Sequence, residues 1–264
     1  MQHNKIDAGI DVGSLSAEAV LFSDGGIVAY AIRRTGANPL RAAESCLQEA
    51  LDKAERSRSD VRHIVATGYG RLRVPFAHRE VTEITCHARG AHYLFPKTRT
   101  VVDIGGQDSK VITLNSRGEV TDFVMNDRCA AGTGRFLEVM ADALETELSQ
   151  LGDLSVEARR GVSISSMCTV FAESEVISLI ADGLEKKDII RGVHESIARR
   201  IFRMTKRLRI RREITFTGGV AKNKGMVAVL ERLFKTKLNI PQEPQVVGAL
   251  GAALLAREMT RQAP

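Results

Sequence analysis

An internal repeat constrains this chain of 264 residues more than any other feature. Residues 6–32, IDAGIDVGSLSAEAVLFSDGGIVAYAI, resemble residues 100–125, TVVDIGGQDSKVITLNSRGEVTDFVM, when the two segments are laid together without a gap. The matched positions are Asp11 with Asp103, Val12 with Ile104, Gly13 with Gly105 and Gly26 with Gly118. Each copy reads as three strands joined by tight turns, and an amphipathic helical pattern follows at residues 39–56 or 133–148. Two matched β-β-β-α halves predict an α/β protein with two similar subdomains that face each other across a cleft.

The first turn of each copy has the composition of an anion-binding loop. In DVGS (11–14) and DIGGQD (103–108), glycines let the backbone approach a ligand, and amide N–H groups can converge on one oxyanion. The aspartate in each turn can hold a hydrated Mg²⁺ ion that binds phosphate. A plain hairpin turn would explain either copy alone. Two copies in register favour a site for phosphate and Mg²⁺.

A third glycine-rich turn occurs near the C-terminus, in EITFTGGVAKNKGMVAVLE (residues 213–231). A short β run ends in Gly218 and Gly219, and an amphipathic helix follows. Glycines at this place suit close packing against a nucleotide base or sugar, and a tight connection between strand and helix is the alternative interpretation. As the third turn of its kind in the chain, it favours a nucleotide.

The four cysteines are scattered, so disulfides are not expected in a cytosolic chain of this size. Cys129, in NDRCAAGTGRFLEVM, and Cys168, in SSMCTVFAESEVISLI, each precede a helical pattern, whose N-terminal partial charge favours thiolate. Structural zinc sites use close cysteine pairs, which this sequence lacks, and buried structural thiols remain the other alternative. Cys46, on an amphipathic pattern, and Cys86, expected at a strand or loop end, are predicted to pack in the core.

The net charge of +6 and the pI of about 9.3 come largely from one basic run. Its members are Arg199, Arg200, Arg203, Lys206, Arg207, Arg209, Arg211 and Arg212. Three interpretations stay open: a solvated helix face opposite the apolar stripe of residues 190–208, a docking face for an acidic protein or phosphate-bearing ligand, and a nucleic-acid site. With no tryptophan and 5% aromatic residues, a stacking platform for single strands is not expected. The chain has neither a bilayer-spanning apolar run nor a signal-peptide pattern, so we expect a cytoplasmic protein that binds neither membrane nor nucleic acid.

Together these motifs resemble a known family over essentially the whole chain. DVGS, DIGGQDSK and FTGGVAKN are similar to the phosphate-1, phosphate-2 and adenosine segments of the superfamily that contains acetate kinase, sugar kinases and actin. CHARGAHYLFP, NDRCAAGTGRFLEVMA and SISSMCTVFAESEVISLIADG further resemble the ATPases that activate 2-hydroxyacyl-CoA dehydratases or form ATP-binding subunits of benzoyl-CoA reductases. The resemblance implies actin/ribonuclease-H-like subdomains, each β-β-β-α-β-α. We expect residues 1–95, completed by a C-terminal helix at 246–260, to form the first and residues 96–245 the second.

The resemblance also implies cofactors and partners. Such activators are homodimers that share one [4Fe–4S] cluster, with two cysteine ligands per chain, which correspond here to Cys129 and Cys168. A cluster of this type takes four thiolates, and a two-fold dimer of this chain would supply them. ATP binding and hydrolysis reorient the helices beside the cluster. One low-potential electron, received from ferredoxin or flavodoxin, then passes to the partner dehydratase or reductase.

We therefore predict an ATPase that drives electron transfer. Asp11 and Asp103 would hold hydrated Mg²⁺ or orient the attacking water, with Gln107 as the third catalytic residue. The nucleotide-binding residues are predicted to be Gly13, Ser14, Gly105, Gly106, Lys110, Gly218, Gly219 and Lys222. Related phosphate-1 segments usually carry lysine where this chain has Glu18, which leaves the rate of ATP turnover and the subfamily open.

Three alternatives remain open from the sequence. A sugar-kinase-like phosphotransferase would use the same cleft. A regulatory ATP-binding module without a cluster would bury both cysteines. The ATP-binding subunit of a benzoyl-CoA-type reductase would pair with a paralogous chain in place of a second copy.

Overall fold

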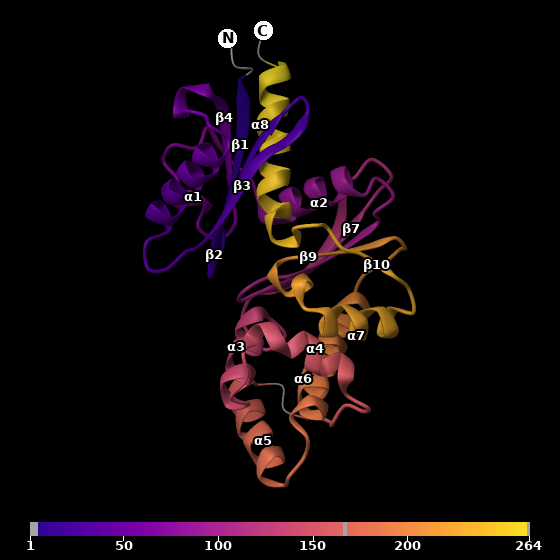
Figure 1. Ribbon diagram of the computed structural model, residues 1–264. Helices are drawn as coiled ribbons and strands as arrows, with labels where there is room; N and C mark the ends of the chain where they lie inside the picture. The colour runs from indigo at the N-terminus through magenta and orange to yellow at the C-terminus, as the bar shows by residue number, and fades with distance from the viewer. Residues whose placement is uncertain (1–4, 166–167, 263–264) are drawn as a thin grey trace.

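The computed structural model describes residues 5–165 and 168–262, which form two five-stranded sheets with helices around them (Figure 1). The first sheet has the order β3-β2-β1-β4-β5. Its strands are β1 (Ile6–Val12), β2 (Ser16–Ser23), β3 (Gly26–Arg34), β4 (Val61–Thr67) and β5 (Arg79–Glu80). β1, β2 and β3 are antiparallel neighbours, and β4 and β5 continue the sheet in parallel.

The second sheet repeats this topology, with the order β10-β9-β6-β7-β8. Its strands are β6 (Thr100–Ile104), β7 (Ser109–Leu114), β8 (Val120–Asn126), β9 (Ile214–Thr217) and β10 (Leu238–Asn239). β6, β7 and β8 are antiparallel, and β9 and β10 are parallel to β6. The prediction of an α/β fold with duplicated subdomains is therefore confirmed. In each copy the repeated segment forms the antiparallel half of its sheet.

The first helix shows how the sequence fixes local structure. α1 (Pro39–Lys53) begins where the side chain of Asn38 accepts a hydrogen bond from the backbone N–H of Arg41, with proline in the first turn. Its apolar positions recur every three or four residues, and they pack against the buried side chains of β1 and β2. Cys46 lies on this face, completely buried, as predicted.

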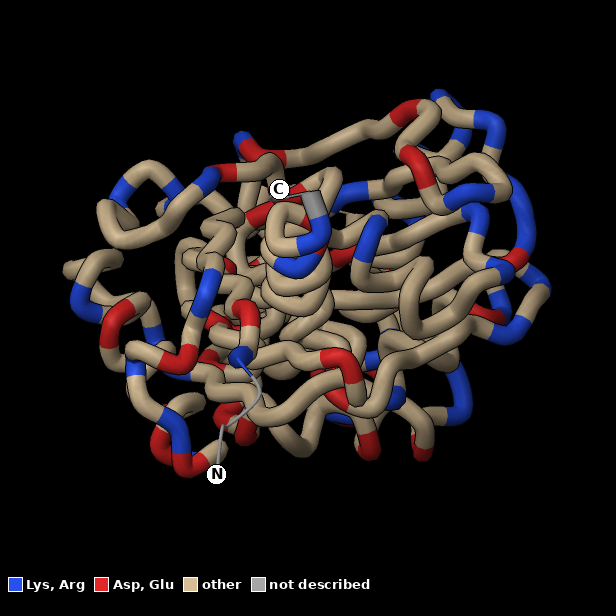
Figure 2. Tube along the Cα trace, turned by 90° about the horizontal axis from the view of Figure 1, so that it is seen from above, with Lys and Arg blue, Asp and Glu red and all other residues tan. Residues whose placement is uncertain are grey.

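Two helices connect the sheets. α8 (Val247–Gln262) packs on β1, β2 and β4, while α2 (Glu83–Leu94) packs against α8 and the strands of the second sheet. Seen from above, α8 is viewed end-on near the centre of the molecule (Figure 2). The C-terminal helix thus lies on the first sheet, although the chain reaches it from the second. The subdomain boundary at residue 95 stays a prediction.

Glycines let α2 and α8 approach closely. A Cβ atom on Gly251 would overlap the carbonyl of Cys86, and one on Gly90 would overlap the carbonyl of Val247. Cys86 was predicted at a strand or loop end, but it lies inside α2, fully buried. The prediction of a core role for this cysteine is confirmed.

A helical block follows β8. It contains α3 (Gly134–Ala143), α4 (Leu151–Glu157), α5 (Thr169–Ala181) and α6 (Lys186–Thr205), and α7 (Lys224–Phe234) follows β9. In Figure 1, α3, α5 and α6 extend below the second sheet. Short 3₁₀ turns occupy Arg58–Asp60, Arg71–Arg73, Leu148–Gln150, Gly219–Lys222 and Pro244–Val246. No helix among residues 5–165 and 168–262 is both long and apolar enough to span a bilayer.

Two details of the predicted helices were wrong. The helix after Cys129 was expected to run to Leu148, but it ends at Ala143 because Glu145 adopts a left-handed conformation with φ of 48°. Leu148 is consequently 44% exposed instead of lying on the buried stripe. For the helix after Cys168, the spacing of Ile177, Ile180 and Leu184 predicts one mostly apolar face that lies on the core. The buried positions of α5 are instead Ala172 and Val176, and Ile177 is exposed.

Candidate functional site

One large cavity lies between the two sheets. Its volume is about 1560 Å³, enough for a nucleotide with its bound water. Every residue predicted to bind nucleotide or act on it lines this cavity: Asp11, Gly13, Ser14, Asp103, Gly105, Gly106, Gln107, Lys110, Gly218, Gly219 and Lys222. The three glycine-rich turns therefore come together at one place, although they lie far apart in the sequence.

The two repeat aspartates lie in contrasting electrostatic environments. The strand register places Asp11 opposite Glu18 and Asp103 opposite Lys110. Burial, reinforced by the charges of Glu18 and Glu83, raises the pKa of Asp11 well above its ordinary value. Equivalent positions of the repeat thus hold a carboxylate pair in one sheet and an ion pair in the other.

Asp103 is held in its ionised form. Burial alone would raise its pKa, but His87, Lys110 and the hydroxyl of Thr217 outweigh burial, so the pKa lies below the ordinary value. Lys110 Nζ lies 3.2 Å from Asp103 Oδ2, and Thr217 Oγ1 donates to Asp103 Oδ1 over 2.9 Å. Lys110 also contacts Asp108 at 2.9 Å. The charge of Lys110, which the sequence predicted to bind nucleotide, is therefore already engaged by carboxylates.

His87, on α2, lies between the two aspartates. Its Nδ1 is 3.4 Å from Asp103 Oδ1, and its Nε2 is 3.9 Å from Asp11 Oδ2. The ring of His87 also approaches the hydroxyl of Thr217 at 3.3 Å. Its position between both carboxylates could not be read from the CHARGAH segment alone.

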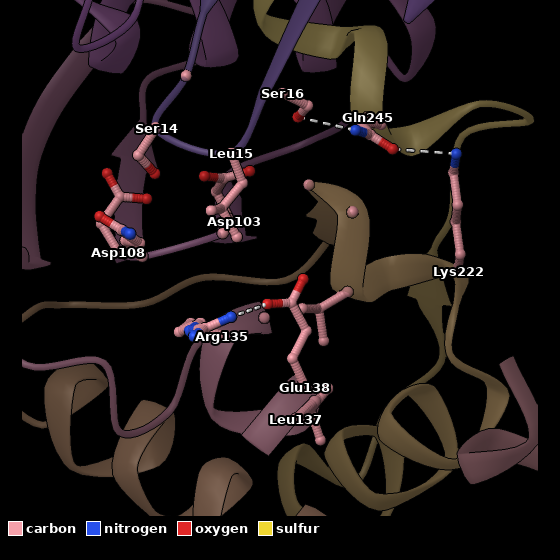
Figure 3. A pocket seen from close by; sticks show the side chains of 18 of the residues that line it. Ser14, Leu15, Ser16, Asp103, Asp108, Arg135, Leu137, Glu138, Lys222 and Gln245 are labelled. Atoms are coloured by element: carbon pink, nitrogen blue, oxygen red, sulfur yellow. Dashed lines mark hydrogen bonds and ion pairs between the residues drawn. The ribbon is translucent and has the colours of Figure 1, made fainter. Parts of the chain in front are cut away.

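Glu18 belongs to a polar chain whose other members, Ser16, Gln245 and Lys222, are seen in Figure 3. Gln245 Nε2 donates to Ser16 Oγ and to Glu18 Oε1, each over 2.9 Å, and Gln245 Oε1 accepts from Lys222 Nζ over 3.1 Å. Burial raises the pKa of Glu18 to about 7, although the hydrogen bonds from Ser16 and Gln245 and the charge of Lys222 oppose it. The chain links a strand of the first sheet with the third glycine-rich turn.

Gln245 was not predicted as a site residue. It lies in the 3₁₀ turn that precedes α8, and it reaches the cavity because the chain returns there from the second sheet to the first. No motif marks it in the sequence. The predicted C-terminal helix that completes the first subdomain was the one indication that residues just before it would lie near the cavity.

The second glycine-rich turn is joined directly to α3. The backbone N–H of Gly134 donates to the carbonyl of Gly105 over 2.9 Å, and that of Arg135 donates to the carbonyl of Gly106 over 2.8 Å. We call these two hydrogen bonds the loop–helix joint. They use N–H groups that the first turn of a helix leaves without intrahelical partners. Movement of this nucleotide loop therefore acts on the start of α3.

From the opposite side of the cleft, Leu15 packs on the same loop. A Cβ atom on Gly106 would fall 2.7 Å from Leu15 Cγ, so a side chain at position 106 would exclude Leu15. Ser14 and Leu15 lie across from Asp103 and Asp108 in the close-up view (Figure 3). The first subdomain thus touches the loop that holds α3.

Cys129 and Cys168 differ from the other two cysteines. Both are free thiols, Cys129 partly exposed and Cys168 exposed, whereas burial raises the pKa of Cys46 and of Cys86 to about 12. Cys168 is the N-cap residue of α5, and Cys129 lies four residues before the N-cap of α3. Neither lines the nucleotide cavity.

Cys129 and Cys168 do not complete a metal site within the described part of one chain. Among the described residues, no group of three or more His, Cys, Asp or Glu side chains is placed to hold an ion. Two accessible thiols at helix starts fit half of a four-thiolate site, with the other half from another chain. Next to Cys168, α5 exposes Val170, Phe171 and Ile177.

Comparison with known proteins gives consistent results. A model of the BadF/BadG/BcrA/BcrD ATPase family matches residues 8–256. The activator of lactoyl-CoA dehydratase from Anaerotignum propionicum is 46% identical over 259 residues, which cover 96% of this chain and 98% of that protein. The crystal structure of Acidaminococcus fermentans (R)-2-hydroxyglutaryl-CoA dehydratase component A has a TM-score of 0.94 and 42% identity, covering 98% and 100% of the two chains. The activator of the 2-hydroxyisocaproyl-CoA dehydratase from Clostridium difficile, solved with bound ADPNP, has a TM-score of 0.92 and 41% identity and covers 98% of each.

Proposed function

Because this chain belongs to the BadF/BadG/BcrA/BcrD ATPase family, we propose that it is the ATP-dependent electron-transfer activator of a 2-hydroxyacyl-CoA dehydratase or related acyl-CoA reductase. The chain is an ATPase with an actin-like fold. Its relatives are named as dehydratase activators, and one was solved with an ATP analogue. The observation that carries the proposal is the loop–helix joint, which ties the nucleotide loop to the helix that follows Cys129.

The cavity residues divide the work of ATP hydrolysis. The backbone amides around Gly13, Ser14, Gly105 and Gly106 cradle the phosphates, and Gln107 orients the attacking water. Asp103, which stays ionised, would hold hydrated Mg²⁺ together with Asp11. Burial raises the pKa of Asp11, which makes its carboxylate a stronger base than that of an exposed aspartate.

Cys129 and Cys168 would hold a [4Fe–4S] cluster jointly with the same residues of a second chain. When bound, the cluster supplies a one-electron centre of low potential. The thiols of this chain are accessible, and Cys168 lies at the N-terminus of α5. The exposed apolar side chains of α5 give the second chain a surface to pack against.

ATP would act on the cysteine end through the joint. Closure of the cleft on the nucleotide moves Leu15 and the loop at Gly105 and Gly106 together, and the loop carries the first turn of α3. The free energy of nucleotide binding then biases the position of Cys129. An acidic ferredoxin or flavodoxin is the proposed electron donor, and the dehydratase or reductase is the acceptor.

Anaerobic purification tests the proposal. We expect a brown protein with about four iron and four sulfide per dimer, in line with a four-thiolate site. A colourless protein that reconstitutes no cluster, and that stays monomeric, would contradict it. In that case, phosphorylation of a sugar would support the kinase alternative, and ATP binding without turnover would support a regulatory module.

Substitution of single cysteines tests the ligand assignment. Cys129→Ser and Cys168→Ser should each remove the iron and abolish electron transfer, while ATP still binds, because neither thiol lines the cavity. Cys46→Ser is the matched control, since a serine hydroxyl can still donate to the carbonyls that Cys46 Sγ contacts, those of Ala17 and Ala31. Loss of iron in the Cys46 variant alone would overturn the assignment.

A further inference from the structure

The basic run at residues 199–212 lies outside the nucleotide cavity. We call it the basic surface: Arg199, Arg200, Arg203, Lys206, Arg207, Arg209, Arg211 and Arg212. All are exposed except Arg200, which is partly buried. The opposite face of α6 is buried through Ile190, Val193, Ile197, Ile201 and Met204, and Leu208 in the following turn is buried as well, as the sequence predicted. The basic side chains therefore form a solvated face opposite the buried stripe.

Little of this charge is neutralised within the chain. Arg199 Nη1 lies 3.7 Å from Glu195 Oε2. Glu195 is already shared with Arg191 and Arg232. The side chains of Arg207, Arg209 and Arg211 make no ion pair with any described residue. Repulsion among cations this close costs stability, and a partner would relieve it.

The basic surface begins beside the cysteine end of the molecule. Arg200 Nη2 donates to Asn126 Oδ1 over 3.2 Å, and Asn126 Nδ2 donates to the carbonyl of Cys129 over 3.0 Å. Arg199, Arg200 and Arg203 line a small groove with Gly132 and Ser165, which follow Cys129 and precede Cys168 in the chain. The surface is thus continuous with the turn that carries Cys129.

We propose that the basic surface is the docking face for an acidic electron-carrier protein, which delivers its electron at the Cys129 end of the chain. This inference rests on the proposed function. In the exchange the carrier is oxidised by one electron and the activator is reduced by one, and no covalent bond forms or breaks. Opposite charge steers such encounters and raises their rate by about tenfold to a thousandfold.

The spread of the charge favours a protein over the other anionic partners. A phosphate group needs cationic donors that converge on one point, whereas these side chains extend from α6 across the following turn. Nucleic-acid binding to single strands uses aromatic side chains between the cations, and Phe202 is the one aromatic residue within residues 199–212, partly buried with Phe234 against it. An acidic protein surface matches an extended cationic one without such additions.

The test uses the cluster-loaded dimer and a reduced bacterial two-cluster ferredoxin as the probe. The variant R207E/R209E/R211E reverses three charges that make no internal ion pair. The matched control, R41E/R73E/R79E, makes the same change in net charge at exposed positions of the first half of the chain. We expect the first variant to weaken ferredoxin binding, and to slow reduction by ferredoxin, by about tenfold or more at low salt. The control should stay within about twofold of the unmodified protein.

Separate readouts distinguish the possible failures. Photoreduced deazaflavin, a small neutral donor, should reduce the unmodified protein, the variant and the control at the same rate. If it reduces none of the three, the proposed function is overturned and the docking face is not the cause. Equal ferredoxin affinity in all three would overturn the docking face. The docking face would also be overturned if the R207E/R209E/R211E variant still bound ferredoxin but had lost binding to a single-stranded oligonucleotide or to anionic vesicles, with the control unchanged.

Discussion

At the scale of single residues, the two copies of the repeat differ in charge at the matched positions Glu18 and Lys110. In the second sheet, Asp103 faces Lys110, and each charge stabilises the other in a buried place. In the first sheet, Asp11 faces Glu18, and two carboxyl groups share a buried place instead. Burial raises the pKa of Asp11, and the charge of Glu18 adds to this effect, whereas His87 and Lys110 outweigh burial and lower the pKa of Asp103.

Glu18 makes stability depend on pH. Its pKa rises from an ordinary 4.5 to about 7 on folding, so the native protein binds the proton more tightly than the unfolded chain. The free energy of unfolding therefore falls as the pH rises through this window. Asp11, Asp103 and Lys222 are the charged groups that act on Glu18 inside the cavity.

The substitution Glu18→Gln should remove this dependence, because the amide oxygen can still accept from Gln245. Between pH 6 and pH 8, the unmodified protein should lose about 1 kcal/mol more stability than E18Q in urea unfolding without nucleotide. Glu44→Gln, at an exposed position on α1, is the control and should behave like the unmodified protein. A parallel pH dependence in E18Q would show that Glu18 does not titrate in this window.

At the scale of elements, the packing of α2 on α8 depends on glycine. Gly251→Ala would force its methyl group into the carbonyl of Cys86, so we expect a loss of about 1–3 kcal/mol in the free energy of unfolding. Gly25→Ala is the comparison, since the nearest atom to its Cβ is Ser23 Oγ at 3.8 Å, and it should change stability by less than about 0.5 kcal/mol. Equal effects in thermal denaturation would mean that the two helices can separate without cost.

The sequence predicted most elements because they follow from local patterns. The repeat, with its aspartates and glycines, identified both sheets and the cavity, since two glycine turns in register favour a ligand site over two plain hairpins. The face of α5 could not be predicted in the same way. That helix has no single apolar stripe, so its packing against α3 and α6 decides that Val176 is buried and Ile177 is not.

Residues whose role depends on the return of the chain also escaped prediction. Gln245 reaches Glu18 because α8 lies on the first sheet, a contact between residues at opposite ends of the sequence. The end of α3 at Ala143 depends on a left-handed turn at Glu145, for which glutamate gives no signal. Such features are set by tertiary packing, which propensity and spacing do not record.

At the scale of the whole molecule, the nucleotide cavity and the cysteine end are separate regions connected by α3. If the loop–helix joint transmits nucleotide binding, saturating Mg-ADPNP should change the rate at which iodoacetamide modifies Cys129 in the iron-free protein by about fivefold or more. Peptide mass spectrometry would follow the modification. Cys46 and Cys86 serve as internal controls, since both are buried and should stay unmodified. An unchanged rate at Cys129 would show that the joint does not couple the two regions.

The loop–helix joint has a consequence in the opposite direction. A coupling free energy between two sites is reciprocal, so whatever factor ATP imposes on the cysteine end, the state of that end imposes on the affinity for ATP. An activator that has just lost its electron would then differ from a reduced one in its hold on nucleotide. Two hydrogen bonds, from Gly134 and Arg135, would thereby let the protein sense at the cavity whether its electron has been delivered.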